Sequence, residues 1–396
     1  MRKKHEYILM YQDDEVLSFS ITFGKTNKIE ILKKLNHFDK APYGINENTS
    51  MEDVKIIFFR FLNRRSIASN RIDFDNILKA TNCKDRLELA FKGHGLSLHD
   101  HYWYRKKDEV LKYSDINFFT NKWDDSFAKA VLNEDYEALK KADLNVPDVV
   151  TSGWAIKGWL CEDKPRLYKL GIAKDHSEES LGEVLASRLA NRIFNKGEVV
   201  EYKLKKFNNR YASVSDVMLN IDEELVPLSI VLPGDIYFAY HERNRDRKYS
   251  EEFFEKIKNY KDLNFYEFFV KLSCMRNLCF ANDLHFDNIS IIRNRKTEEM
   301  RIAPLYDLAG AFGGTESARK LLSHIDKATY IVVYFLYGNF DPKWDYSWYD
   351  PDKLIGFEDE IREILSLSDF YTPEIINNII DVYRHQKKSL DEIAKK

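Results

Sequence analysis

A hairpin is predicted in the segment between Asp283 and Asp307. A short β-branched run at 289–292, a polar turn and a second apolar run at 300–303 are typical of two antiparallel strands. Neighbouring strands lie about 4.8 Å apart, so Asn288, which precedes the first strand, is brought close to Asp307, which follows the second. The chain is therefore expected to fold locally into a hairpin whose open end carries oxygen-bearing side chains.

These side chains match the needs of a phosphoryl-transfer site. A Mg²⁺ ion prefers hard oxygen ligands together with phosphate oxygens, and Asn288 and Asp307 supply them. Asp283 lies five positions before Asn288, the same offset as in the protein-kinase catalytic loop, where the Asp accepts the substrate hydroxyl proton and the Asn holds a Mg²⁺ ion. The alternative is that Asp and Asn residues beside a hairpin only make ordinary turns.

Composition sets the frame for this site. A chain of 396 residues predicts two or three domains, and 44% hydrophobic with 14% aromatic residues is ample for sizeable cores. The net charge of −3, from 61 basic and 64 acidic residues, gives no overall electrostatic footprint for nucleic acid. We therefore expect no direct nucleic-acid binding. A local basic patch is the alternative that the net charge leaves open.

The cysteines indicate a reducing compartment. Cys83, Cys161, Cys274 and Cys279 have no metal-finger spacing. No secretory signal pattern and no membrane-length apolar window is found in the sequence, so we expect a cytoplasmic protein without membrane association. Cys274 and Cys279 fall in an apolar helical run and are expected to be core thiols.

Three regions differ in texture and predict an α+β fold. Residues 1–145 mix strand-like and helical pieces and are expected to form an N-terminal accessory domain of mixed α/β structure. A polar stretch with Pro147 marks a boundary. Residues 146–235 are β-rich with one helix, and residues 236–396 are mainly helical. A small β-rich lobe before a larger helical lobe is the order of a two-lobed kinase core.

A glycine-containing segment at 151–158 is predicted to be a turn between two strands. It includes Ser152, Gly153 and Lys157, which could offer backbone N–H groups and a cation to phosphates. It is not a Walker A motif. The alternative is a tight turn with an exposed lysine.

A lysine and a glutamate follow this segment. Residues 166–172 predict a strand on whose half-buried face Lys169 lies, and a buried lysine needs a partner. The next helix, with Ser177 as its N-cap, carries Glu183 on the flank of its apolar stripe. A strand Lys paired with a helix Glu positions the phosphates of ATP in kinases. The alternative for Glu183 is a solvated position beside the stripe.

The order of these motifs resembles the HipA family of bacterial Ser/Thr protein kinases, known from toxin–antitoxin systems. Asp-x-His-x-x-Asn occurs at 283–288 and Ala-Pro-x-Tyr-Asp at 303–307, after a Ser-Gly-x-x-x-Lys loop at 152–157. The resemblance covers about residues 148–396 and is strongest at 265–310. It implies a two-lobed kinase fold with ATP and Mg²⁺ in the cleft, and an antitoxin-like protein as a partner.

The resemblance also implies roles for individual residues. They are Asp283 as the catalytic base, Asn288 and Asp307 as Mg²⁺ ligands, Lys169 as the phosphate-positioning lysine, Glu183 as its partner, His285 and Tyr306 as lining of the nucleotide pocket, and Ser152, Gly153 and Lys157 as the ATP-binding loop. In some members a loop serine is autophosphorylated, and Thr151 or Ser152 would serve here.

The chain departs from the family in several places. Asn282 directly precedes Asp283, whereas the family commonly has the motif Gly-Asn-x-Asp, with one residue between the Asn and the Asp. Residues 154–156 are Trp-Ala-Ile where a Gln is usual, which puts the phosphate contacts in question. We expect the adenine-contacting linker at 214–216. The accessory domain shows no motif of the best-known members.

Two further clusters lie in the accessory domain. His99 and His101 would share one strand face, as a metal pair with His94 or Asp100, or as hydrogen-bonded imidazoles of a structural strand. The run at 61–71 is locally basic, and would contact an anion or an acidic partner, or be solvated surface.

The sequence thus predicts an ATP- and Mg²⁺-dependent kinase that phosphorylates a Ser or Thr hydroxyl of a protein. A catalytically silent nucleotide-binding or interaction module, and a kinase of a small molecule, are the alternatives. The protein substrate is not readable from the sequence.

Overall fold

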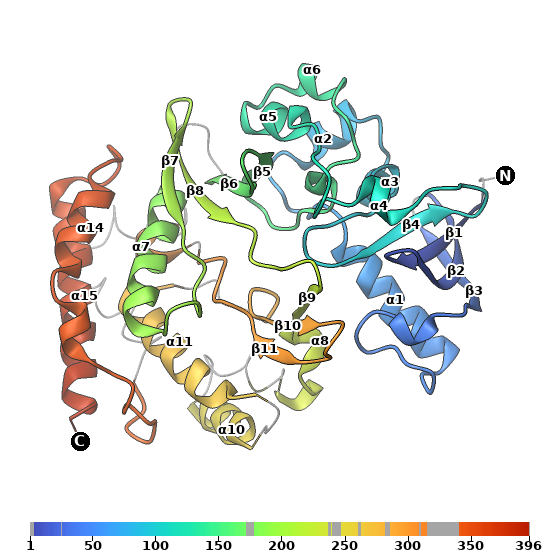
Figure 1. Cartoon of the computed structure of the whole chain (residues 1–396). Helices are drawn as coiled ribbons and strands as arrows, with labels where there is room; N and C mark the ends of the chain where they lie inside the picture. The colour runs from blue at the N-terminus through green and yellow to red at the C-terminus, as the bar shows by residue number, and fades with distance from the viewer. Residues whose placement is uncertain are drawn as a thin grey trace. The chain divides into compact units, whose positions relative to one another are not determined.

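The computed structural model describes residues 4–24, 26–171, 178–236, 239, 247–259, 263–281, 286–308, 310–314 and 340–395. The chain divides into two compact units, and Figure 1 labels their elements. The first unit comprises Met1–Ile172, Leu219–Val226 and Asn294–Thr297, and the second comprises Ala173–Met218, Pro227–Arg293 and Glu298–Lys396. Among the described helices, none is both long and apolar enough to cross a membrane.

An antiparallel sheet opens the first unit. Its four strands lie in the order β3-β2-β1-β4. Their bounds are β1 (Lys4–Tyr11), β2 (Asp14–Thr22), β3 (Lys28–Lys34) and β4 (Tyr102–Lys106). Alternate residues of β1, Tyr7, Leu9 and Tyr11, are all buried in one core cluster, as expected for residues that share one face of a strand.

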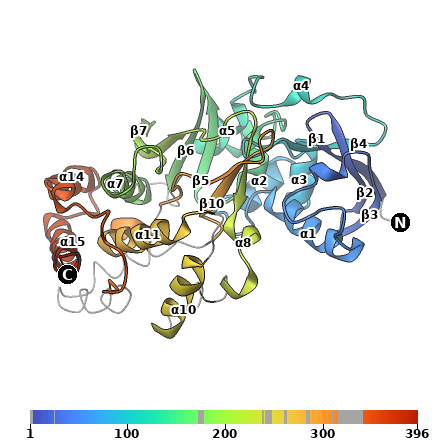
Figure 2. The same ribbon diagram turned by 60° about the horizontal axis from the view of Figure 1, so that its bottom comes forward.

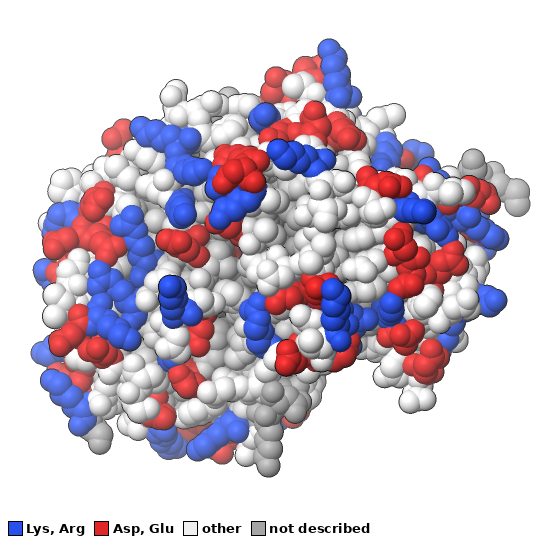
Figure 3. Space-filling model, in the orientation of Figure 1, with Lys and Arg blue, Asp and Glu red and all other residues white. Residues whose placement is uncertain are grey.

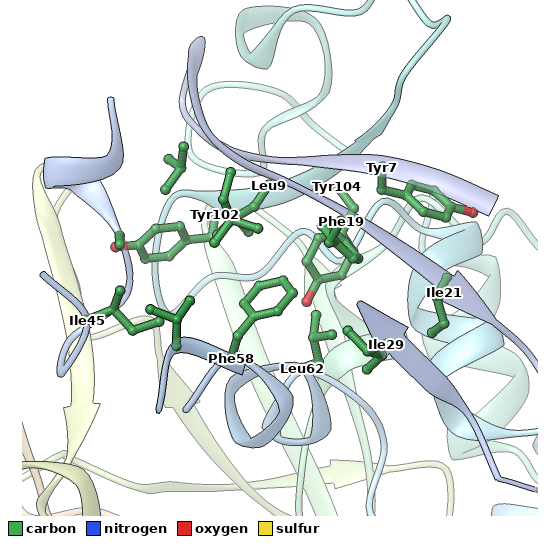
Figure 4. Close-up of a cluster of buried hydrophobic side chains, with 14 of the residues drawn as sticks. Tyr7, Leu9, Phe19, Ile21, Ile29, Ile45, Phe58, Leu62, Tyr102 and Tyr104 are labelled. Carbon is green, nitrogen blue, oxygen red and sulfur yellow. The ribbon is translucent and has the colours of Figure 1, made fainter. Parts of the chain in front are cut away.

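Helix α1 (Met51–Arg64) packs on this cluster. The Ser50 side chain accepts a hydrogen bond from the Asp53 N–H and so caps the start of the helix. Phe58 and Leu62, one turn apart, are fully buried. The Phe58 ring lies 4.9 Å from the Phe19 ring of β2 in an edge arrangement. Figure 4 labels both residues in this cluster. Burial of such aromatic side chains stabilises the accessory region as a folded body.

Short helices and a hairpin complete the first unit. The helices are α2 (Phe74–Ala80), α3 (Arg86–Lys92), α4 (Tyr113–Ile116), α5 (Ser126–Leu132) and α6 (Tyr136–Leu139), with the 3-10 turns η1 (Phe38–Lys40) and η2 (Pro147–Val150). The hairpin consists of β5 (Ile156–Cys161) and β6 (Pro165–Gly171). A Cβ on Gly158 would lie 3.0 Å from the Cβ of Ala128, so glycine lets β5 approach α5 closely.

Two later segments join the first unit. The Leu225 N–H, in β9 (Glu223–Pro227), donates to the His99 carbonyl over 2.8 Å. Arg295 lies 3.7 Å from the Glu224 carboxylate, and its guanidinium lies 5.0 Å from the centre of the Tyr11 ring. Burial raises the pKa of Tyr11 to about 12, so the phenol is neutral beside this ion pair.

The second unit is mainly helical. Its helices are α7 (Glu178–Ile193), α8 (Leu228–Val231), α10 (Arg247–Lys258), α11 (Phe265–Cys279), α14 (Phe357–Leu365) and α15 (Pro373–Ile393), with 3-10 turns η3 (Ala311–Gly313) and η4 (Pro351–Leu354). Its strands are β7 (Lys203–Phe207), β8 (Arg210–Asp216), most of β10 (Ser290–Asn294) and β11 (Met300–Ile302). Figures 1 and 2 show α14 and α15 side by side, and α7 packs on α14.

The described structure is thus mixed α/β with antiparallel hairpins, as the sequence predicts. The accessory region contains both strands and helices, and Cys274 and Cys279 are buried in α11 as expected. The two-lobed arrangement and the domain limits at 145/146 and 235/236 stay predictions.

Candidate functional site

The glycine-containing segment runs from a 3-10 turn into a strand. The prediction of a strand before the turn is wrong, because residues 147–150 form η2 and only β5 is a strand. Pro147 has the fixed φ that suits the first position of a helical turn. The Asp148 carboxylate then accepts the Trp159 N–H over 2.9 Å, which ties the turn to β5. Lys157 consequently lies in the strand rather than in an exposed turn.

Gly153 makes room for the Lys157 side chain. Gly153 has a φ of +96°, and a Cβ built on it would lie 2.2 Å from Nζ of Lys157. The backbone conformation favours glycine here, and any larger residue would displace the Lys157 ammonium group from this position. Lys157 is only 6% exposed, so the alternative of a surface lysine does not hold. The ammonium group instead lies against the backbone of the loop.

The two candidate phosphorylation residues of this loop differ in accessibility. Thr151 is buried, and its hydroxyl donates to the Pro147 carbonyl over 2.9 Å and accepts the Trp159 indole N–H over 3.1 Å. Ser152 is exposed. In this conformation only the Ser152 hydroxyl is presented to solvent.

Lys157 and Lys169 lie directly opposite each other on β5 and β6. Opposed residues of an antiparallel pair project from the same face of the sheet, and Lys169 is 5% exposed. The two lysines thus come from opposed positions on one face of the β5–β6 hairpin, and both side chains are buried. The half-buried strand position predicted for Lys169 is confirmed.

Glu183 lies in the middle of α7 and is buried at 1% exposure. The alternative of a solvated carboxylate beside the apolar stripe is therefore wrong. The Ser213 hydroxyl of β8, itself fully buried, donates a hydrogen bond to the Glu183 carboxylate. A buried carboxylate held in this way is fixed in place. Its pairing with Lys169 stays a prediction.

The hairpin predicted between Asn288 and Asp307 is confirmed. Strands β10 and β11 pair antiparallel, with Ile291 opposite Ile302. The Ala303 N–H donates to the Ser290 carbonyl over 2.9 Å and extends the pairing toward the open end. Asn288 and Asp307 each lie just beyond this paired region. The binding of a shared cation by the two side chains stays a prediction.

Asp307 is held in an unusual backbone conformation. Its φ is +56°, a left-handed value that non-glycine residues adopt mainly where the surroundings impose it. Its N–H donates to the Tyr202 hydroxyl over 3.0 Å. The Ser187 hydroxyl of α7 in turn accepts the Tyr202 N–H over 3.2 Å. The backbone of Asp307 is therefore connected through Tyr202 to the helix that carries Glu183.

The same helix approaches the chain again after Asp307. Gly310 turns the backbone with a φ of +89°, and η3 follows. A Cβ on Gly182 of α7 would lie 2.4 Å from the Ala311 carbonyl oxygen. Only glycine at position 182 therefore permits this contact between α7 and the segment after Asp307. Gly182 directly precedes Glu183, so the contact lies next to that residue.

Tyr306 contributes to the hairpin. Its hydroxyl lies 2.7 Å from the Ser290 hydroxyl, and its ring packs on a core cluster that includes Val184 and Tyr202. Burial raises the pKa of Tyr306. The side chain thus stabilises the open end of the hairpin, and its contact with a nucleotide stays a prediction.

The ends of the predicted catalytic loop are both anchored. Helix α11 ends at Phe280 in a left-handed conformation, and the Arg276 side chain donates to the Ala281 carbonyl over 2.8 Å. At the other end the Phe286 ring is buried against Phe253 and Phe269. Asn282, Asp283 and His285, which lie between these anchors, fall outside the described residues. The predicted linker at 214–216 forms the end of β8.

The histidines of the accessory region make structural hydrogen bonds. His101 is fully buried, and its Nδ1 lies 2.6 Å from the Tyr113 hydroxyl. Nδ1 of His94 lies 3.2 Å from the Tyr104 carbonyl oxygen. Within the described ranges there is no group of three or more His, Cys, Asp or Glu side chains arranged to hold a metal. The hydrogen-bonded alternative therefore fits these residues.

In the basic run at 61–71, Arg64 is exposed, as expected of solvated surface, whereas Arg65 and Arg71 are buried. Arg65 pairs with Asp100 and Arg71 with Asp73, and both arginines are almost fully buried. On the face drawn in Figure 3, Lys and Arg are interspersed with Asp and Glu. These two arginines are internal ties of the first unit rather than contact points for an external anion.

Comparison with known proteins identifies the fold. No protein-family model matches the chain, and no curated protein sequence matches it. A solved structure of the Shewanella oneidensis MR-1 toxin–antitoxin proteins HipA and HipB with operator DNA is similar at 11% identity, with a TM-score of 0.53 over 98% of this chain and 99% of that chain. The Helicobacter pylori proinflammatory kinase CtkA matches at 16% identity, with a TM-score of 0.40 over 61% of this chain and 90% of that one. The chain has a HipA-like fold.

Proposed function

We propose that the chain is a protein kinase that transfers the γ-phosphoryl group of ATP to a Ser or Thr hydroxyl. The observation that carries the proposal is the pair of opposed, buried lysines, Lys157 and Lys169, beside a loop whose backbone favours glycine at position 153. A lysine beside a glycine loop and a lysine on the following strand are the cations that contact the phosphates of ATP in kinases. The similarity of the fold to HipA also supports the proposal of a kinase.

The lysines would bind and orient the phosphates of the nucleotide. Lys157 lies against the loop backbone, where it would contact the terminal phosphates together with loop N–H groups. Lys169 would hold the α- and β-phosphates, with Glu183 as its partner. The hydrogen bond from Ser213 holds the Glu183 carboxylate in place, which supports its role as an ordered partner.

The hairpin would supply the metal ligands, and the loop that precedes the hairpin would supply the catalytic base. Asn288 and Asp307 offer an amide and a carboxylate oxygen, the hard donors that Mg²⁺ prefers, and the strained backbone of Asp307 favours a fixed ligand. Bound Mg²⁺ would neutralise charge on the β- and γ-phosphates. Asp283 would accept the proton of the attacking hydroxyl. His285 and Tyr306 would line the nucleotide pocket.

Regulation is proposed at two levels. Ser152 is exposed on the glycine loop, so phosphorylation there would add negative charge where the phosphates of ATP bind and would oppose binding. The similar HipA structure contains HipB and operator DNA, and an antitoxin-like protein partner is proposed for this chain by analogy.

Intact-mass measurement after incubation with Mg-ATP tests the proposal. We expect a gain of one phosphoryl group on the wild type, mapped to Ser152, and no gain for Asp283→Asn. Asp287→Asn is the matched control, because that carboxylate is exposed and accepts the Ser229 hydroxyl instead. A mass gain that persists in Asp283→Asn would overturn the assignment of the base.

The alternatives give different outcomes. Tight ATP binding without transfer to any protein or to the chain itself would favour a silent nucleotide-binding module. Transfer to a metabolite hydroxyl, with no protein product, would favour a small-molecule kinase. Absence of ATP binding by the folded wild type would overturn the proposal as a whole.

A further inference from the structure

The accessory region contacts the proposed phosphate loop through Arg71. The Arg71 side chain is 1% exposed, and it donates to the Asp73 carboxylate over 2.6 Å from Nε and 3.2 Å from Nη2. Nη2 also donates to the backbone carbonyl of Lys157 over 3.0 Å. A charged donor held by a carboxylate makes a strong and directional contact. The guanidinium therefore fixes the backbone of the residue whose ammonium lies at Gly153.

Neighbouring contacts reinforce this tie. The Ile72 N–H donates to the Trp154 carbonyl over 3.2 Å, so the residue after Arg71 holds the loop itself. The guanidinium of Arg71 also acts on Asp148, where it opposes the rise of the pKa caused by burial. Three successive parts of the loop region, at 148, 154 and 157, are thus within reach of residues 71–73.

The tie lies where β5 is irregular. The register of β5 on β6 shifts between Ile156 and Lys157, and such shifts turn a strand locally and redirect its side chains. Past the shift, Lys157 faces Lys169. A donor from outside the hairpin to the Lys157 carbonyl would stabilise one direction of the Lys157 side chain at this irregular point.

We infer that Arg71, oriented by Asp73, is a positioning residue that holds the glycine loop and Lys157 in the geometry that binds phosphates. The inference rests on the proposed function, and it gives the accessory region a role in nucleotide binding. Arg71 itself would not touch the nucleotide, because its donors are directed to Asp73 and to the Lys157 backbone.

Arg65 provides a matched comparison within the same unit. It is also buried, it pairs with Asp100, and it donates to the backbone carbonyls of Gly95 and Tyr102. Both arginines thus tie a carboxylate to backbone carbonyls. Only the tie made by Arg71 reaches the loop segment, so loss of Arg65 should affect folding without moving Lys157.

The experiment compares Arg71→Lys and Asp73→Asn with Arg65→Lys and Asp100→Asn in the full-length chain. Thermal melting and the Kd of a nonhydrolysable ATP analogue are measured for each, on the folded protein at low temperature, together with kcat and KM for ATP. We expect all four variants to melt earlier. The Kd and KM should rise about tenfold or more for the changes at 71 and 73, and less than about twofold for the controls, because small displacements of a positioning group weaken binding strongly.

The outcomes separate the two proposals. If the folded wild type does not bind the analogue, the proposed function is overturned, whatever the variants at 71 and 73 do. If the wild type binds it and the variants at 71 and 73 bind equally well, Arg71 has only a structural role and the inference is overturned. If Arg71→Lys does not fold, the milder variant Asp73→Asn is used instead. Its Kd for the ATP analogue is then compared with that of Asp100→Asn, and this comparison decides between the two roles.

Discussion

The Ser213 hydroxyl donates a hydrogen bond to the buried carboxylate of Glu183. The two residues come from different elements, β8 and α7. Because both side chains are almost fully removed from solvent, the hydroxyl replaces water as a donor to the charged group. This contact fixes the residue that is proposed to orient Lys169.

Ser213→Ala should weaken both stability and nucleotide binding. A hydrogen bond to a charged group contributes about 1.5–3 kcal/mol, so the free energy of unfolding in urea should fall by that order. The Kd for an ATP analogue should rise, since Glu183 loses its orientation. Ser66→Ala is the control, because Ser66 is equally buried but donates to the Asn63 carbonyl in the accessory region. Equal Kd values for both variants would contradict the proposed role of Glu183.

Gly153→Ala should abolish phosphate binding at a modest cost in stability. A left-handed backbone with a side chain costs about 1 kcal/mol, and the new Cβ would lie 2.2 Å from Nζ of Lys157. Gly197→Ala is a close control, because Gly197 has a φ of +88° with nothing within 4 Å of an added Cβ. Both variants should lose similar stability in denaturant. Only Gly153→Ala should lose ATP binding in a titration. If both variants bind ATP, the phosphates do not bind at the loop that contains Gly153.

Tyr202→Phe should weaken the binding of Mg²⁺. The change removes the acceptor of the Asp307 N–H, which costs about 1 kcal/mol and frees the strained backbone of Asp307. The Mg²⁺ concentration that gives half-maximal phosphoryl transfer should therefore rise. Tyr113→Phe removes a phenol that bonds His101 in the first unit and should leave that concentration unchanged. An unchanged Mg²⁺ dependence in Tyr202→Phe would argue against Asp307 as a metal ligand.

Local parts of the site were predictable because they follow from neighbouring residues. The β-branched runs beside a polar turn indicated the hairpin that ends near Asp307. Strand alternation placed Lys169 on a buried face, and helical periodicity placed Glu183 in a helix. The strand expected before Gly153 was wrong, since the turn chemistry of Pro147 and Asp148 outweighs the two valines that follow.

The contacts that fix these parts could not be predicted, because they join distant positions. Arg71 and the Lys157 carbonyl are 86 positions apart, and Asp307 and Tyr202 are 105 apart. A basic run reads as surface unless its carboxylate partners are known, and Arg65 and Arg71 are buried only because Asp100 and Asp73 pair with them. Tyr202 gave no signal beyond being an aromatic residue in the β-rich region predicted at 146–235.

The buried carboxyl of Asp148 should make stability fall as pH rises. Burial raises its pKa from 3.8 to about 7, so the folded state binds this proton more tightly than the unfolded state. The stabilisation is complete below pH 3.8 and is lost as pH rises to about 7. Asp148→Asn keeps an oxygen for the Trp159 N–H but does not ionise. The difference in unfolding free energy, variant minus wild type, should therefore grow by on the order of 1 kcal/mol per pH unit in that window.

Asp235→Asn supplies a control whose difference from the wild type should stay constant between pH 4 and pH 8. The hydrogen bond from Lys256 lowers the pKa of Asp235, so the stability that it contributes is present above pH 3.8 and is lost only on further acidification. Denaturant unfolding of both variants and the wild type at intervals from pH 4 to pH 8 separates the two effects. A flat difference for Asp148→Asn across this range would show that the carboxyl is ionised throughout, and hence that it is hydrated or paired at the start of the glycine loop.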